Sequence, residues 1–246
     1  SPFESIPCAL RHLQTGDTII LEDGVYEDQI YFGLKGVVLS SRFLLDGDTS
    51  HIRKTRLDGV NHFGSTYFIN GPSNQWVNFQ IVGLTIENVV GYAVSLNNYV
   101  NSKIQNVYFE NLGNAGGSVS APIYVYGNTL IDQCVFRYNP AGAFVIQMQS
   151  NNGFSIMDRC IWYENGGSAT RTSRGLIWTS KMILRNSYFY HNYCGVINGF
   201  NQGMDSCMVI NNAFVENYSH AFRLENAGGG LSYFFINNIF ENNKYT

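Results

Sequence analysis

A ten-residue motif recurs along much of the chain and limits the folds that the chain can adopt. Met208–Asn217 reads MVINNAFVEN, and close variants occupy Ile156–Asn165, Ile183–Asn192 and Phe234–Asn243. Each of these copies places an aromatic residue three positions before an asparagine. Successive aromatic residues of the series are 25 to 27 residues apart. A constant period in the twenties is typical of solenoids, in which each repeat packs only on its neighbours.

The residue types inside the repeat favour a β-solenoid over a helical one. Short runs of Val, Ile, Phe and Tyr are broken by Asn and Gly, and the Leu, Ala, Glu and Lys pattern of helical repeats is missing. Two or three short strands fit into one coil of this length. We therefore predict an all-β fold, a right-handed parallel β-helix, whose equivalent positions stack about 4.8 Å apart from coil to coil.

The register of the repeat predicts which side chains form columns along the solenoid. An internal aromatic column is expected from Phe109, Phe136, Trp162, Phe189, Phe214 and Phe240. A facing apolar column is expected from Val94, Ile123, Phe144, Leu176, Val196 and Phe222. Stacked amides that bond to one another and to the backbone are expected from Asn139, Asn165, Asn192, Asn217 and Asn243.

The repeat runs without a break, so we expect one domain over residues 1–246. Residues 1–14 should form a cap, 15–80 irregular first coils, and 81–246 regular coils. In the cap, Ser5 precedes apolar residues at helical spacing, which predicts a short helix over the open first coil. The last run, 234–243, is rich in β-formers and should present an open sheet edge that pairs with another protein chain.

The composition argues against several classes of partner and against a disulfide-based fold. The formal net charge is −3 and no basic run occurs, which argues against nucleic acid. No apolar stretch approaches the roughly 20 residues of a membrane-spanning helix. Five cysteines do not form a disulfide framework in a chain of this length. Cys134 and Cys160 occupy the same column on neighbouring coils, either as buried thiols or as a disulfide.

Two N-terminal segments resemble known protein families. After the expected helix, GDTIILEDGVY at 16–26 resembles the opening of secreted pectate-lyase-like β-helix proteins and is similar to the start of the alginate lyase and chondroitinase B family. The segment 38–59 resembles uncharacterised extracellular β-helix proteins of bacteria that often carry a C-terminal sorting domain. The resemblance implies secretion to the cell surface and a polysaccharide partner, and it implies no particular reaction.

Three ionisable residues recur two positions after the repeat aromatic. Glu164, His191 and Glu216 lie on consecutive coils. A carboxylate–imidazole–carboxylate row is suited to a general base with a tuned pKa. The alternative is a solvated row of alternating charges beside the asparagine turn.

A second charged group precedes the aromatic column. It contains Asp132 and Asp158 together with Arg159 and Arg185. Uronate lyases of the resembling superfamily neutralise a substrate carboxylate, often with calcium, and abstract the C5 proton with a basic residue. The resemblance implies that the two aspartates are candidates for calcium and the two arginines for the carboxylate. The alternative is ordinary ion pairing between coils.

Two further groups are weaker candidates for binding. Asp46 and Asp48, in Asp-Gly-Asp, suit either calcium or a turn. Calcium is the one cofactor that these residues suggest, and no firm metal site is expected. A polar outward face that could hold sugar rings is expected from Tyr124, Tyr126, Gln147 and Gln149.

Taken with the resemblance, these patterns favour an extracellular β-helix module that binds or scaffolds at the cell surface without catalysis. The alternative is a polysaccharide lyase acting on uronate glycans. The motifs with a specific signal are those of the fold, and none of the charged groups carries a recognisable catalytic signature.

Overall fold

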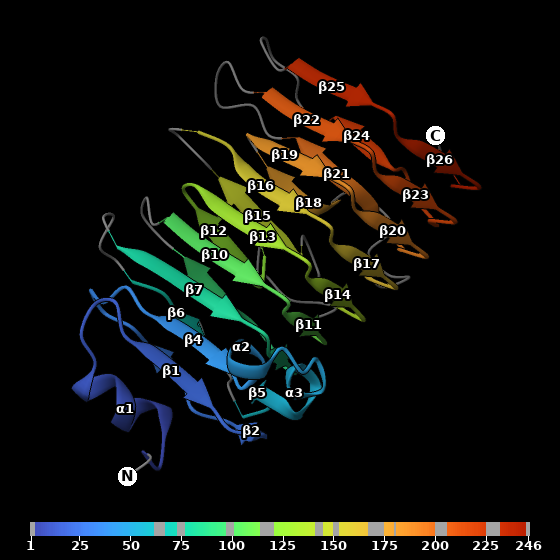
Figure 1. The fold of residues 1–246 in the computed structure, drawn as a ribbon. Coiled ribbons are helices and arrows are strands. Elements are labelled where there is room, and N and C mark those ends of the chain that lie inside the picture. The colour runs from blue at the N-terminus through green and yellow to red at the C-terminus, as the bar shows by residue number, and fades with distance from the viewer. Residues whose placement is uncertain are drawn as a thin grey trace.

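A computed structural model shows the chain as a solenoid of three parallel β-sheets (Figure 1). It describes residues 3–61, 67–72, 77–96, 101–113, 121–140, 145–149, 153–166, 175–179, 181–199, 206–224 and 232–244. At 198–199 and 222–224 the description covers the backbone only. Each strand pairs in parallel with the equivalent strands of neighbouring coils. The predicted parallel β-helix is confirmed.

The three sheets are named A, B and C in the order in which each coil enters them. Sheet A contains β1 (Thr18–Leu21), β4 (Val38–Ser41), β7 (Asn78–Val82), β10 (Asn101–Gln105), β13 (Thr129–Asp132), β16 (Ser155–Asp158), β19 (Met182–Arg185), β22 (Ser206–Ile210) and β25 (Ser232–Ile236). Sheet B contains β2 (Gly24–Tyr26), β5 (Thr55–Asp58), β8 (Thr85–Glu87), β11 (Tyr108–Glu110), β14 (Val135–Arg137), β17 (Ile161–Tyr163), β20 (Tyr188–Tyr190), β23 (Ala213–Val215) and β26 (Ile239–Glu241). Sheet C contains β3 (Ile30–Tyr31), β6 (Ile69–Asn70), β9 (Val94–Leu96), β12 (Ile123–Tyr126), β15 (Ile146–Gln149), β18 (Gly175–Thr179), β21 (Gly195–Gly199) and β24 (Phe222–Leu224).

The predicted N-terminal helix is present as α1 (Ile6–His12). The Ser5 side chain accepts a hydrogen bond from the backbone N–H of Cys8 at 3.2 Å, which caps the helix. Ile6 is buried in the main core, and Leu10 and Leu13 pack against it. The helix therefore covers the first coil at the N-terminal end of the solenoid (Figure 1).

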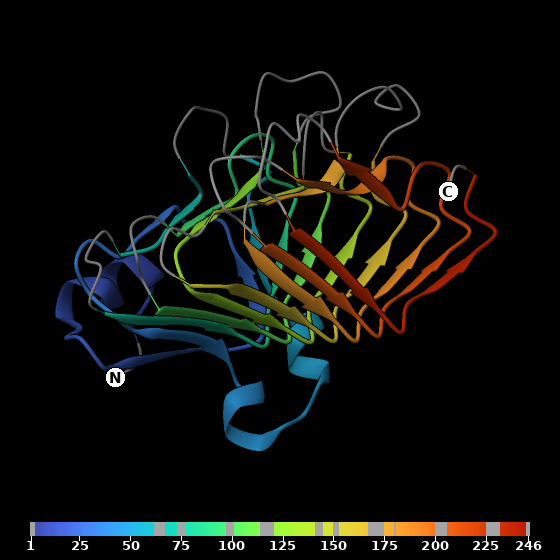
Figure 2. The ribbon, with the colours of Figure 1, turned by 90° about the horizontal axis from the view of Figure 1, so that it is seen from above.

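Two further helices interrupt the coil between β4 and β5 and were not predicted. They are α2 (Phe43–Asp46) and α3 (Ser50–Lys54), and they project from the body of the solenoid (Figure 2). Phe43 lies against Gly83, where a Cβ atom would be only 2.4 Å from a ring carbon of Phe43. Gly83 also has a φ of +62°, so the position requires glycine on both grounds.

The aromatic column is confirmed. Phe109, Phe136, Trp162, Phe189, Phe214 and Phe240 are register partners on successive strands of sheet B. The Trp162 ring lies 3.9 Å from that of Phe136 and 5.7 Å from that of Phe189, with interplanar angles of 8° and 15°. Nearly parallel rings in six successive coils make this column the centre of the core over that part of the solenoid.

The asparagine column is also confirmed. The Asn165 side-chain amide donates to the carbonyl of Phe136 at 2.8 Å and to the Asn192 side-chain oxygen at 2.9 Å. The same Asn192 oxygen accepts the backbone N–H of Asn165 at 3.1 Å. Each buried amide thus ties three coils together and satisfies backbone groups at the turn.

The apolar column in sheet C differs from the prediction. Ile123 pairs with Ile146, and Ile177 pairs with Ile197. Ile177 and Ile197 therefore occupy the positions at which Leu176 and Val196 were expected. The predicted member Phe144 lies outside the described residues. From the aromatic column to this column the chain takes 14, 10, 15 and 8 residues in four successive coils. The segments before sheet C vary in length, so spacing from the aromatic cannot set its register.

The two stacked cysteines are free thiols in the core. The Cys134 thiol donates to the carbonyl of Asp132 at 3.4 Å, and the Cys160 thiol donates to that of Asp158 at 3.3 Å. Burial raises the pKa of the Cys160 thiol well above its ordinary value. Both side chains therefore act as small buried hydrophobic groups with weak donors.

The last coil is open at its outer edge. Apolar side chains of β25 and β26 are about half exposed, including Phe235 at 45% and Phe240 at 44%. Their register partners on the preceding coil, Val209 and Phe214, are fully buried because the last coil covers them. None of the described helices is long and apolar enough to cross a membrane.

Candidate functional site

The predicted carboxylate–imidazole row lies at the corner where strands of sheet B end. Glu164, His191 and Glu216 have φ values of 50°, 51° and 51°. This left-handed conformation ends the strand alternation and turns the side chains outward. His191 Nε2 lies 2.8 Å from Glu216 Oε2, which joins two of the three residues. Glu164 instead bonds to the Tyr163 hydroxyl, which raises the pKa of Tyr163 to about 12.

The same face carries a continuous row of tyrosines, which we call the tyrosine strip. Its members are Tyr108, Tyr138, Tyr163, Tyr188, Tyr190, Tyr193 and Tyr218, from β11 to the turn that follows β23.

Ring contacts connect the tyrosine strip across successive coils. Tyr163 lies 5.6 Å from Tyr138 and 5.8 Å from Tyr190, measured between ring centroids. His191 stacks on Tyr190 at 3.7 Å and lies 5.6 Å from Tyr218. The Arg137 guanidinium lies 5.5 Å from the ring of Tyr138. Because Tyr108, Tyr163, Tyr188 and Tyr190 lie on strands of sheet B and the other rings contact their neighbours, the strip is preorganised.

The rings of the tyrosine strip are oriented mainly toward one another. Tyr163 and Tyr190 are parallel within 6°, so much of each face is turned toward the neighbouring ring. Tyr138, Tyr188 and Tyr218 remain 42%, 40% and 38% exposed. The strip therefore offers partly open rings along a row of self-stacked ones.

The N-terminal end of the tyrosine strip is lined by ion pairs. Arg53 from α3 lies 4.8 Å from the centroid of the Tyr108 ring and forms an ion pair with Glu110. Arg137 Nε bonds to the same carboxylate at 2.5 Å. The helical insertion thus supplies a residue to the end of the strip.

The second predicted charged group is built from ion pairs between neighbouring coils. Arg159 donates to both oxygens of Asp132, at 2.9 and 2.6 Å. Arg185 donates to Asp158 at 3.0 and 2.8 Å, and Asn186 donates to its other oxygen at 2.8 Å. The guanidinium groups lie where a cation would approach, so these carboxylates do not fit a calcium site.

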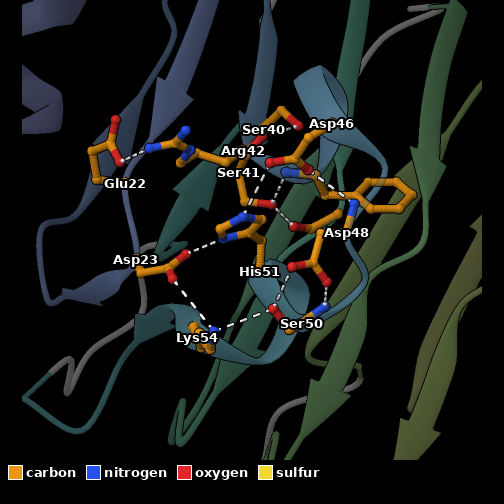
Figure 3. Close-up of polar contacts among 12 residues, drawn as sticks. Glu22, Asp23, Ser40, Ser41, Arg42, Asp46, Asp48, Ser50, His51 and Lys54 are labelled. Carbon is orange, nitrogen blue, oxygen red and sulfur yellow. Dashed lines mark hydrogen bonds and ion pairs between the residues drawn. The ribbon is translucent and has the colours of Figure 1, made fainter.

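Asp46 is the last residue of α2, and Asp48 lies in the turn between α2 and α3 (Figure 3). Asp46 accepts the backbone N–H of Asp48 at 2.9 Å, and Asp48 accepts that of Ser50 at 2.8 Å. His51 lies between two carboxylates, with Nδ1 2.5 Å from Asp23 and Nε2 3.2 Å from Asp46. The bond to Asp23 raises the pKa of His51.

Asp46 and Asp48 therefore bond within the insertion, and the contact between His51 and Asp23 ties the insertion to the solenoid. Turn chemistry accounts for the Asp-Gly-Asp sequence without a metal. Among the described residues, no group of three or more His, Cys, Asp or Glu side chains is arranged to hold a metal ion.

The predicted sugar-binding face lies on β12 and β15 of sheet C. Tyr124 pairs with Gln147, and Tyr126 pairs with Gln149, so the four side chains share one face as expected. Gln147 is buried, however, and the Tyr124 hydroxyl donates to Gln149 at 3.1 Å. Much of this face is therefore already satisfied by its own contacts.

The tyrosine strip was not predicted, although the sequence contains a signal for it. The copies ending in FRYN, WYEN and FYHN each carry a second aromatic residue immediately or two positions after the ladder aromatic. In a solenoid, such a recurrence places the extra rings on one outer face.

Comparisons with known proteins bear on the fold. A family model for the right-handed β-helix region matches residues 68–245. Searches of curated proteins and of solved structures found no significant match. The matched span covers most of the chain and coincides with the repeating coils. The chain belongs to the right-handed β-helix family.

Proposed function

We propose that this chain is an extracellular, non-catalytic β-helix module that binds polysaccharide at the cell surface through the tyrosine strip. The observation that carries the proposal is the row of seven tyrosines, in which ring contacts run from Tyr138 to Tyr218 and Arg137 joins Tyr108 to Tyr138. Placement outside the cell rests on the resemblance of the N-terminal segments to secreted β-helix proteins.

The chemistry of tyrosine supports this choice of ligand. A phenol combines an apolar ring with a hydroxyl that donates and accepts hydrogen bonds, which matches the mixed faces of a sugar. The partly open rings of Tyr138, Tyr188 and Tyr218 lie on several coils, which suits a long ligand. Since the sheet holds the rings in place, little side-chain entropy is lost on binding.

The alternative function is a lyase acting on uronate glycans, and one observation favours it. The 2.8 Å contact between His191 and Glu216 would orient an imidazole for proton abstraction. Against this, Arg159 and Arg185 are each committed to an aspartate. A lyase needs a group that neutralises the substrate carboxylate, and these arginines do not supply it.

Affinity electrophoresis through gels containing neutral, uronate or amino-sugar polysaccharides tests the proposal. We expect at least one polymer to retard the protein, and the double variant Tyr163→Ala/Tyr190→Ala to migrate freely. Tyr124→Ala on sheet C is the matched control and should still be retarded. If no polymer retards the protein, or if the control loses binding and the double variant keeps it, the proposal is wrong.

The alternative is tested in parallel. A lyase would release unsaturated products from alginate, pectate or chondroitin, detected by ultraviolet absorbance with calcium present. Release that is lost in His191→Ala or Arg185→Ala would replace binding by catalysis as the function.

A further inference from the structure

The tyrosine strip is electrostatically uneven along its length. At its N-terminal end the cations are Arg53, Arg56 and Arg137, and each forms an ion pair with an acidic residue. The acids are Asp58, Glu87 and Glu110, so three positive and three negative charges cancel. This end presents no excess charge to a ligand.

The C-terminal half of the strip is acidic. Glu164 and Glu216 lie beside the rings of Tyr163, Tyr190 and Tyr218, on coils separated by one other coil. Within the described parts of the chain, neither carboxylate forms an ion pair with an arginine or a lysine; Glu216 contacts His191. The Glu216 side chain is 45% exposed. Two coil steps of about 4.8 Å place the two backbone positions about 10 Å apart.

The neighbouring phenols add neutral hydrogen-bonding groups beside these carboxylates. Hydrogen bonding to Glu164 raises the pKa of Tyr163 to about 12. Burial, and then the charge of Glu216, raise the pKa of Tyr190. Both phenols stay neutral near pH 7 and present oxygen acceptors beside the carboxylates. A polyanion is therefore repelled here, whereas an ammonium group meets carboxylates, phenol oxygens and electron-rich rings.

We propose that the ligand of the tyrosine strip is a polysaccharide that carries protonated amino groups. This inference rests on the proposed function and specifies the class of its ligand. Amines spaced along the polymer bond to Glu164 and Glu216, while the sugar rings lie along the partly open tyrosines. A uronate polymer, in contrast, would bring carboxylates to the same surface.

The test compares one amino-sugar polymer in two forms, with free amines and fully N-acetylated, against alginate. Titrations of the protein with each polymer near pH 6 should show the free-amine form binding about fivefold tighter than the acetylated form, the upper end of the effect of one exposed charge contact. The double variant Glu164→Gln/Glu216→Gln should remove that preference. Raising the salt concentration should also reduce the preference.

Several results would overturn the inference while leaving the proposed function intact. These are equal affinity for the two forms, tighter binding of alginate, or an unchanged preference in the double glutamine variant whose melting temperature matches the wild type. Tighter binding of polylysine than of the free-amine polymer would instead indicate a protein partner. Failure of every polysaccharide to bind would contradict the proposed function itself.

Discussion

Replacing Trp162 by alanine should destabilise the solenoid more than any change on its outer face. The side chain is fully buried, between rings at 3.9 and 5.7 Å. Excavation of a buried aromatic costs about 3–5 kcal/mol, and the cost rises when the surroundings cannot collapse into the cavity. The asparagine column fixes the spacing of the adjacent coils. We therefore expect a loss near the upper end, about 4–5 kcal/mol.

Trp162→Phe keeps an aromatic ring in the column and removes the indole N–H, so it separates the contribution of the ring from that of the N–H. The Trp162 indole N–H is buried and has no hydrogen-bond partner in the described part of the chain. Removing it relieves an unsatisfied donor, worth about 1–3 kcal/mol, and this offsets the loss of ring area. The register partners of Trp162 on the neighbouring coils are both phenylalanine. The free energy of unfolding of Trp162→Phe should therefore lie within about 1.5 kcal/mol of that of the wild type.

Urea denaturation followed by circular dichroism measures these free energies of unfolding. The control Tyr163→Ala removes a neighbouring ring that points outward, and it should cost clearly less than Trp162→Ala. Equal losses from Trp162→Ala and Tyr163→Ala would mean that the assigned register is wrong. A loss for Trp162→Phe as large as that for alanine would refute the argument from the indole N–H.

Three further predictions concern other parts of the fold. Asn165→Ala should cost about 3 kcal/mol in the same denaturation assay, because it leaves buried groups on neighbouring coils unpaired, and a loss below about 1 kcal/mol would contradict the role of the column. The pKa of His51 is raised in the folded state, so its stabilisation should be complete below its unfolded pKa of about 6.5 and decline as pH rises through the folded value. His51→Gln should lack that decline in melting temperature, and identical pH profiles would sink the idea. The half-exposed apolar side chains of β25 and β26 should make this chain self-associate in light scattering, and Ile236→Lys should reduce it; a monomer at high concentration would rule it out.

Only part of the candidate site could be predicted from the sequence. The period placed Glu164, His191 and Glu216 in one column, as the structure shows. It did not reveal that the His191 ring contacts Glu216, or that Glu164 bonds to Tyr163 instead. Side-chain direction at this corner depends on the left-handed backbone, which residue spacing does not specify.

The sequence alone determined the coil period, the aromatic column and the asparagine column. The coils from Phe136 onward repeat the same local requirement, an aromatic residue three positions before an asparagine, so the pattern is visible without a structure. The N-terminal helix was equally local, since Ser5 supplies its cap.

Only the tertiary structure decided the register of sheet C, the α2–α3 insertion and the assembly of the tyrosine strip. Segments of unequal length precede the strands of sheet C, so Ile177 and Ile197 replace the expected Leu176 and Val196. The insertion occurs once, and no repeat marks it. The strip joins side chains from different coils, and contacts such as Arg53 with Tyr108 link residues far apart in the chain. Such contacts depend on how coils stack in space, which is a property of the whole solenoid rather than of any one repeat.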